Sequence, residues 1–276
     1  MIISVSRRGD IPRFHFDWFM ERLGEGFTET VNPFNAAQVR RVSLLPEDAE
    51  VLVFWTRDPG VIARRAEELG GRRYYVMTTL TGYGPLLEPN MPPPEAVIAA
   101  IRDLAGMLGP ERLIWRYDPL FLSDETDRAF HLRNFRALSR ALRGAVSRVI
   151  TSVYDEYGGS RRRIAALERA GALRPRPHYT AEGAWVSEVR LLAADLAGLA
   201  AEAGMELRTC AEGEEAAELG IAAGACIDGE LIRRLWGIEA GCKDRNQRPR
   251  CRCAPSVDIG RYGSCPAGCV YCYARR

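Results

Sequence analysis

The stretch Val51-Leu-Val-Phe-Trp-Thr-Arg-Asp-Pro59 sets the pattern on which the fold prediction rests. Five apolar residues, most of them β-branched or aromatic, are followed at once by a polar turn that ends in proline. Such a run predicts a strand that stops at the polar turn. A helical pattern then covers residues 60–69. The stretch therefore predicts one β-α unit whose strand ends in polar side chains.

The same unit recurs along the chain. Further strands are expected at 2–6, 74–80, 112–117, 147–154, 205–209 and 257–260. Helices are expected at 14–23, 95–108, 125–143, 160–170, 184–203 and 230–236. Strands that alternate with helices at even intervals indicate a parallel sheet. We predict an α/β fold, a full or partial parallel β/α barrel formed by a single domain, residues 1–276. A doubly wound open sheet is the alternative.

Polar side chains follow strand after strand. Because parallel strands end at one edge of the sheet, and that edge carries the chemistry of β/α barrels, these side chains are expected to meet there. The groups are Arg7/Arg8/Asp10, Thr56/Arg57/Asp58, Arg116/Asp118, Asp155/Glu156 and Cys210/Glu212.

Charge and hydropathy exclude several classes of protein. Among the 276 residues, 38 Lys and Arg face 36 Asp and Glu, so no global field favours nucleic acid or an anionic membrane. The first residues hold two arginines after a very short apolar run and do not resemble a signal peptide. The most apolar long stretch, 191–204, contains Asp195 and Glu202 and is not a membrane span. A cytoplasmic protein is expected.

All eight cysteines follow residue 209, in a region taken as 205–276. This clustering favours metal over a disulfide scaffold, which would be smaller and secreted. Cys265, Cys269 and Cys272 form a C-x₃-C-x₂-C motif near the C-terminus. Three thiolates from one loop can hold three irons of a [4Fe–4S] cube and leave the fourth iron open. A chance pattern or a zinc site is the alternative.

This motif, with Tyr271 before its last cysteine, resembles that of the radical S-adenosylmethionine (SAM) superfamily. The run Tyr271-Cys-Tyr273 is locally similar to the spore photoproduct lyase branch. Most members carry the cluster loop after the first barrel strand, whereas here it follows the last, as if the order were permuted. The whole chain also resembles a bacterial family of domains of unknown function. The shared stretches are Ser6-Arg-Arg-Gly-Asp-Ile-Pro12, Val53-Phe-Trp-Thr56, Trp115-Arg-Tyr-Asp-Pro119 and Tyr271-Cys-Tyr-Ala274.

The radical SAM resemblance implies a reaction and a set of ligands. Cys265, Cys269 and Cys272 would ligate the cluster, and SAM would chelate the open iron. One electron from an external flavodoxin- or ferredoxin-type donor would cleave SAM to a 5′-deoxyadenosyl radical, which abstracts hydrogen from an unknown substrate. The superfamily's glycine-rich SAM motifs are not recognisable. The strand-end residues Arg57, Arg116 and Asp118, together with Tyr271, are therefore the candidate SAM contacts.

Four other cysteines, Cys210, Cys226, Cys251 and Cys253, suit a second site. A Cys₄ set fits an auxiliary [4Fe–4S] cluster, which we favour, and a structural zinc ion equally well by ligand type. Cys242 is left over, and a buried small residue is expected there.

Two further functions stay open. The first is a DNA photolesion lyase, which would need a basic groove that a net charge of +2 supports little. The second is a non-enzymatic protein with fully ligated sites, either an iron–sulfur electron carrier or a zinc-stabilised binding protein.

Overall fold

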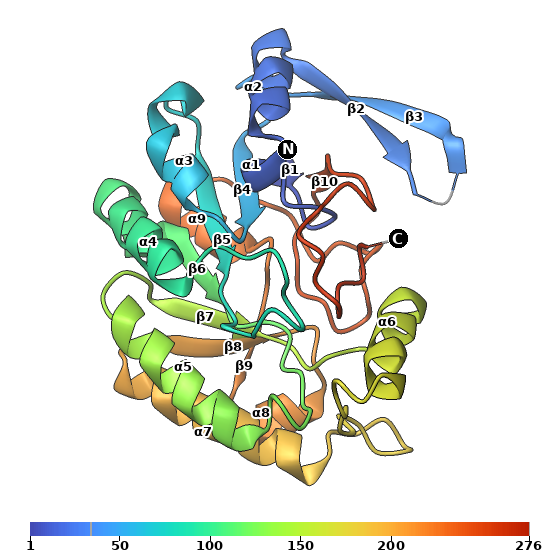
Figure 1. The fold of residues 1–276 in the computed structure, drawn as a ribbon. Coiled ribbons are helices and arrows are strands. Elements are labelled where there is room, and N and C mark those ends of the chain that lie inside the picture. Colours follow the sequence, from blue (N-terminus) through green and yellow to red (C-terminus); the bar gives the residue numbers. More distant parts are fainter. Residues whose placement is uncertain (34, 276) are drawn as a thin grey trace.

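The computed structural model describes residues 1–33 and 35–275. Its centre is an eight-stranded sheet in the order β10-β1-β4-β5-β6-β7-β8-β9, and every neighbouring pair is parallel (Figure 1). The strands are β1 (Ile2–Val5), β4 (Val51–Thr56), β5 (Tyr74–Thr79), β6 (Leu113–Arg116), β7 (Arg148–Thr151), β8 (Glu206–Cys210), β9 (Ala222–Gly224) and β10 (Val257–Asp258). The predicted parallel α/β fold is confirmed. Across the described residues no pairing joins β9 to β10, so these two strands are the edges of the sheet.

The helices follow the strands in the predicted order. They are α1 (Ile11–Phe14), α2 (Phe16–Glu25), α3 (Gly60–Arg64), α4 (Pro94–Leu108), α5 (Arg128–Leu142), α6 (Gly158–Arg169), α7 (Ser187–Glu202), α8 (Glu214–Glu218) and α9 (Gly229–Trp236), with 3₁₀ turns at Ala66–Leu69 and Pro110–Arg112. Asp127 caps α5, where it accepts a hydrogen bond from the Phe130 amide, and Asp228 caps α9 in the same way. No helix of the described chain is both long and apolar enough to cross a membrane.

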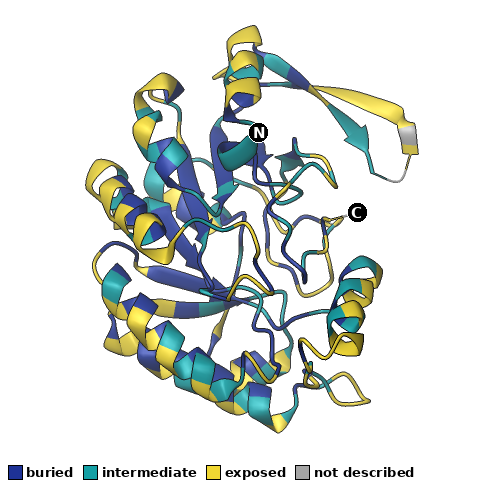
Figure 2. Cartoon of the chain, viewed as in Figure 1, coloured by how far each residue is buried: buried dark blue, intermediate teal, exposed yellow. Residues whose placement is uncertain are grey.

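The two faces of the sheet have different covers. On one face, alternate strand residues such as Leu52, Phe54 and Trp115 pack in the main core, which includes residues of α2, α4, α5 and α7. On the other face, Val53, Tyr75, Met77 and Ile150 pack against α9 and the segment 251–254. Burial on both sides explains why the strands are continuous apolar runs. Figure 2 shows this buried sheet beneath helices that expose their outer sides.

Two features were not predicted. An antiparallel hairpin of β2 (Phe27–Asn32) and β3 (Asn35–Ser43) extends away from the sheet, and much of its surface is exposed (Figure 2). The short strand β9 contains only alanine and glycine, which carry little strand signal.

The last strand, β10, pairs with the first strand, β1. Ile3 lies opposite Val257 and Ser4 opposite Asp258. The last strand thus lies beside the first, and the C-terminal cysteine loop (residues 265–272) follows it. Gly260 allows this approach, because a Cβ there would lie 1.9 Å from Ser6 Oγ.

Candidate functional site: two cysteine groups

The C-terminal cysteine loop packs at the edge where the parallel strands end. Cys269 and Tyr271 are buried in an apolar cluster with residues such as Tyr83 and Phe121, and Cys265 and Cys272 lie half-buried at its margin. Burial raises the pKa of the Cys265 thiol, and it raises that of Cys269 to about 11, although the Arg57 charge opposes the second shift. All three thiols are free.

A buried network joins this loop to the sheet. Arg57, which follows β4, donates to Glu88 Oε1 at 2.9 Å and to the Tyr271 hydroxyl oxygen at 2.5 Å. The Tyr271 hydroxyl in turn donates to Glu88, and Thr81 Oγ1 donates to Glu88 Oε1 at 2.5 Å. Burial alone would lower the pKa of Arg57, but the charges of Glu88, Tyr271 and Cys269 and the hydrogen bond to Tyr271 together raise that pKa well above its usual value. The network is a buried ion pair in which Glu88 Oε1 accepts from Arg57, Thr81 and Tyr271, and it lies beside Cys269.

Hydrogen bonds to the main chain fix the rest of the loop. Arg163 of α6 donates to the Val270 carbonyl at 2.9 Å and also to the Cys272 carbonyl. His15 Nε2 lies 3.0 Å from the Ser264 carbonyl. These contacts join residues 107 and 249 positions apart in the chain, so local sequence patterns carry no sign of them.

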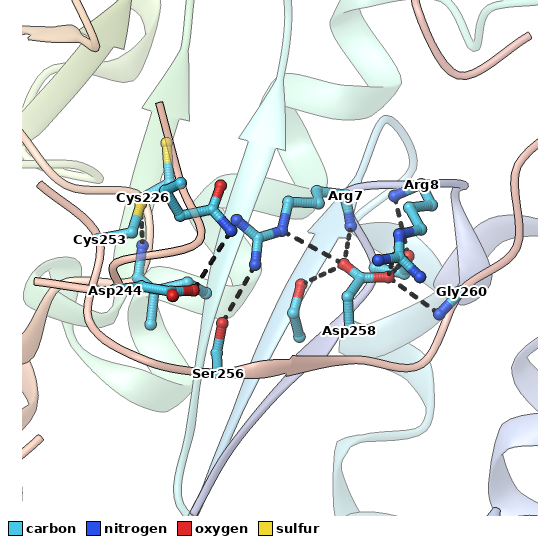
Figure 3. Close-up of polar contacts among 12 residues, drawn as sticks. Arg7, Arg8, Cys226, Asp244, Cys253, Ser256, Asp258 and Gly260 are labelled. Atoms are coloured by element: carbon cyan, nitrogen blue, oxygen red, sulfur yellow. Dashed lines mark hydrogen bonds and ion pairs between the residues drawn. The ribbon is translucent and has the colours of Figure 1, made fainter. Parts of the chain in front are cut away.

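A second carboxylate organises the end of β1. Asp258 accepts hydrogen bonds from Ser4 Oγ and Ser6 Oγ at 2.7 Å each and from the Arg7 amide at 2.9 Å. The Arg7 guanidinium lies against Asp258 and donates to Ser256 at 3.1 Å, as Figure 3 shows. The polar residues after β1 and β10 therefore serve largely to hold these two strands together.

The other four predicted ligands lie together on the face of the sheet that α9 covers. Cys210 ends β8, Cys226 follows β9, and Cys251 and Cys253 come from the segment after α9. The Cys210 and Cys226 sulfurs are 3.4 Å apart, and Cys253 is within hydrogen-bonding reach of both Cys226 and Cys251. Hydrogen bonds with Cys226 and Cys251 lower the pKa of the Cys253 thiol. The contact with Cys210, followed by that with Cys253, raises the pKa of the Cys226 thiol, and the contact with Cys253 raises that of Cys251.

Arg116 and Asp118 belong to this second group. Arg116 Nη1 donates to Cys226 Sγ at 2.8 Å, and its Nη2 donates to Asp118. The guanidinium also lies 5.0 Å from the centre of the Trp55 ring. Burial would lower the pKa of Arg116, but the charges of Asp118, Cys226 and Cys210 and the hydrogen bond to Asp118 together raise it.

The structure thus separates the predicted SAM contacts into two sets. Arg57 and Tyr271 lie with the C-terminal cysteine loop, whereas Arg116 and Asp118 lie with the second cysteine group. Glu88, in the proline-rich loop after β5, is a further site residue that the sequence did not indicate. Cys242 is exposed and belongs to neither group, so the expectation that it is buried was wrong. Across residues 1–33 and 35–275, no three His, Cys, Asp or Glu side chains stand ready to hold a metal ion.

Two cavities open beside these groups. One of about 250 Å³ is lined by residues that include Arg57, Thr81 and Glu88. The other, of about 330 Å³, lies where β7 and β8 end and is lined by residues that include Asp155, Trp185 and Glu212. Glu212 accepts hydrogen bonds from the Val153 amide and the Trp185 indole, and burial raises its pKa to about 7.

Fold and site define a parallel α/β protein with two cysteine groups on one sheet. The chain belongs to the family described as "Domain of unknown function (DUF1848)", whose model matches residues 2–274. No curated protein matches the chain.

Two solved structures show a distant likeness. The D-hydantoinase from a Bacillus sp. AR9 is 11% identical with a TM-score of 0.33, and the match covers 68% of this chain and 38% of that one. The dihydropyrimidinase from Brevibacillus agri NCHU1002 is 12% identical with a TM-score of 0.34, and the match covers 75% and 45%. The chain spans less than half the length of either, and likeness at this level supports no functional conclusion.

Proposed function

We propose that this protein is a radical SAM enzyme whose [4Fe–4S] cluster is held by Cys265, Cys269 and Cys272. One observation carries the proposal. Three free thiols lie on one loop that follows a strand of a parallel α/β sheet, at the edge where such proteins place their chemistry. The permuted strand order brings that loop beside β1.

The three thiols fit a cube better than a single ion. In a cube each thiolate binds a different iron, so the three sulfurs need not converge on one point. Arg57 beside Cys269 would also stabilise a thiolate there.

When bound, the cluster supplies one-electron chemistry: an electron from an external flavodoxin- or ferredoxin-type donor splits SAM into methionine and a 5′-deoxyadenosyl radical. The residues of the chain position this chemistry. The Arg57–Glu88–Tyr271 network and Arg163 fix the loop. The apolar cluster around Cys269 limits water at the buried side of the loop. The substrate class stays undefined.

Of the two arginines predicted to bind the SAM carboxylate, Arg57 is the one beside the cysteine loop. Its guanidinium already holds Glu88, so a bound carboxylate would have to share it. A forked guanidinium has enough donors for both partners.

The test is anaerobic reconstitution with iron and sulfide, followed by reduction with dithionite in the presence of SAM. We expect release of 5′-deoxyadenosine and methionine. The Cys269→Ala variant should lose both iron and cleavage, whereas Cys242→Ala, an exposed cysteine outside both groups, should keep them. Reconstituted wild-type protein that holds the cube but neither binds nor cleaves SAM would instead support an electron carrier.

A further inference from the structure

We propose that Cys210, Cys226, Cys251 and Cys253 form a second metal site that takes one tetrahedral thiophilic ion, such as Zn²⁺, rather than a second [4Fe–4S] cluster. This proposal is independent of the first cysteine group. It chooses between a zinc ion and an iron–sulfur cluster, two occupants that four cysteine ligands fit equally well by type.

The location of the four thiols points to a ligand. They come from three separate segments and converge on an apolar sheet face among Tyr75, Met77 and Ile150. Cys226, Cys251 and Cys253 are buried, and all four are free thiols. Four reactive thiols gathered in an apolar interior without a disulfide are typical of a structural Cys₄ site.

The sulfur spacing distinguishes the two kinds of site. Thiolates that share one zinc ion, with bonds of about 2.3 Å, lie about 3.8 Å from one another. The ligands of a cube lie further apart, because each binds a different iron at a different corner. The Cys210 and Cys226 sulfurs are 3.4 Å apart, and Cys253 reaches both Cys226 and Cys251. This close row matches ligands of a single ion.

Neighbouring donors suit a thiolate site. The Ile227 amide donates to Cys253 Sγ at 3.4 Å and the Cys253 amide to Cys251 Sγ at 3.5 Å. The Arg116 guanidinium donates to Cys226 Sγ at 2.8 Å. One Zn²⁺ with four thiolates carries a net charge of −2, which Arg116 partly offsets within the apolar face. Such outer contacts orient ligands and tune a metal site.

Binding of one ion would require the two end thiols of the row to move inward. As placed, the described side chains do not surround an ion with three ligands. Cys210 and Cys251 are the two ends of the row, so rotation of these two side chains toward Cys226 and Cys253 would complete a tetrahedron. The ion would then fix the segment 251–254 on the sheet, directly before β10 and the C-terminal cysteine loop.

The experiment separates this site from the first. In full-length protein, the triple change Cys265/Cys269/Cys272→Ala removes the first group. After anaerobic purification and exposure to iron with sulfide, and separately to ZnCl₂, this variant should hold about one zinc and no cube. Added CoCl₂ should produce the visible absorption of a tetrahedral cobalt–thiolate site, and ZnCl₂ should abolish that absorption.

Cys226→Ser in the same background should lose the cobalt spectrum, and Cys242→Ser should keep it. Because Cys226 is buried, the half-buried Cys210→Ser serves as a second variant, and circular dichroism checks that each is folded. About four irons per chain in the triple variant would overturn the proposal. A Cys210–Cys226 disulfide with no metal uptake after reduction would do so too. Neither result bears on SAM cleavage by the first group.

Discussion

The Arg57 guanidinium and the Tyr271 hydroxyl meet at 2.5 Å, although the two residues are 214 positions apart in the chain. This bond joins the end of β4 to the residue between two proposed iron ligands. Glu88 accepts from both partners, so the three side chains act as one unit.

Replacing Tyr271 with Phe should separate anchoring from packing. The ring stays and the hydroxyl is lost, so Arg57 and Glu88 each lose one hydrogen bond. We expect the free energy of unfolding to fall by about 1–3 kcal/mol, measured by anaerobic denaturant unfolding. Tyr273→Phe is the matched control: the Tyr273 hydroxyl donates to the Arg7 carbonyl in an exposed setting, so its removal should lower the free energy of unfolding by less. Equal losses would mean that the network does not anchor the loop.

Replacing Glu88 should lower the free energy of unfolding by more than removing the Tyr271 hydroxyl does. Glu88→Leu leaves the Arg57 charge buried without a carboxylate, which typically costs about 3–5 kcal/mol. Arg57→Met in the same protein should restore part of that loss, since it removes the unpaired charge. A double change no more stable than Glu88→Leu alone would contradict a coupled ion pair.

The two predicted SAM arginines should behave differently. Arg57→Gln should weaken SAM binding to the iron-loaded protein at least about tenfold, because the loss of one charge-assisted hydrogen bond weakens binding by about that factor. Arg116→Gln should leave SAM affinity unchanged and weaken cobalt binding at the second group instead. Isothermal titration with each ligand measures both effects. The reverse pattern would show that the SAM site lies at the second cysteine group.

Histidine 131 should make the protein sensitive to mild acid. Its ring is buried between the Tyr117 hydroxyl and the Phe121 carbonyl, and burial lowers its pKa to about 4. The unfolded chain binds the proton near pH 6.5, so stability is full above that value and falls as the pH drops toward 4. The loss is at most about 1.4 kcal/mol per pH unit. His131→Gln should flatten the unfolding free energy over this range, and an unchanged slope would contradict the prediction.

Glu212 should lower the stability of the protein as the pH rises, the opposite of the effect of His131. Burial raises the pKa of Glu212 to about 7. The contribution of this group to the free energy of unfolding is therefore fully present below about pH 4.5 and is lost as the pH rises through 7. Glu212→Gln should therefore gain stability relative to wild type as the pH rises from 5 to 8. Unfolding measurements on Glu212→Gln, with the exposed Glu214→Gln as control, test this. A parallel pH profile for Glu212→Gln and wild type would refute it.

The sequence was sufficient for the parallel sheet because its strands are buried on both faces and so form apolar runs. It missed β2 and β3, which form an exposed hairpin rich in polar residues without a regular apolar pattern, and β9, which has no bulky residue. The positions of the cysteines predicted which thiols form each group. Glu88 could not be found, since it lies in a proline-rich loop and meets Tyr271 only through a contact across 183 positions. The division of Arg57 and Arg116 between the two groups likewise follows from packing, not from their shared place after strands.

The pairing of β10 with β1 also orders events during synthesis. Ser4 and Asp258 bond across 254 positions, so β1 leaves the ribosome long before its partner exists. All eight cysteines of this sequence lie at or after residue 210, so residues 1–209 supply no thiol that could capture metal or oxidise while the first strands assemble. The proposed metal sites could therefore be loaded only once most of the sheet has been made. Ribosome-bound chains that carry only residues 1–209 of this protein should expose no thiol of their own to thiol reagents.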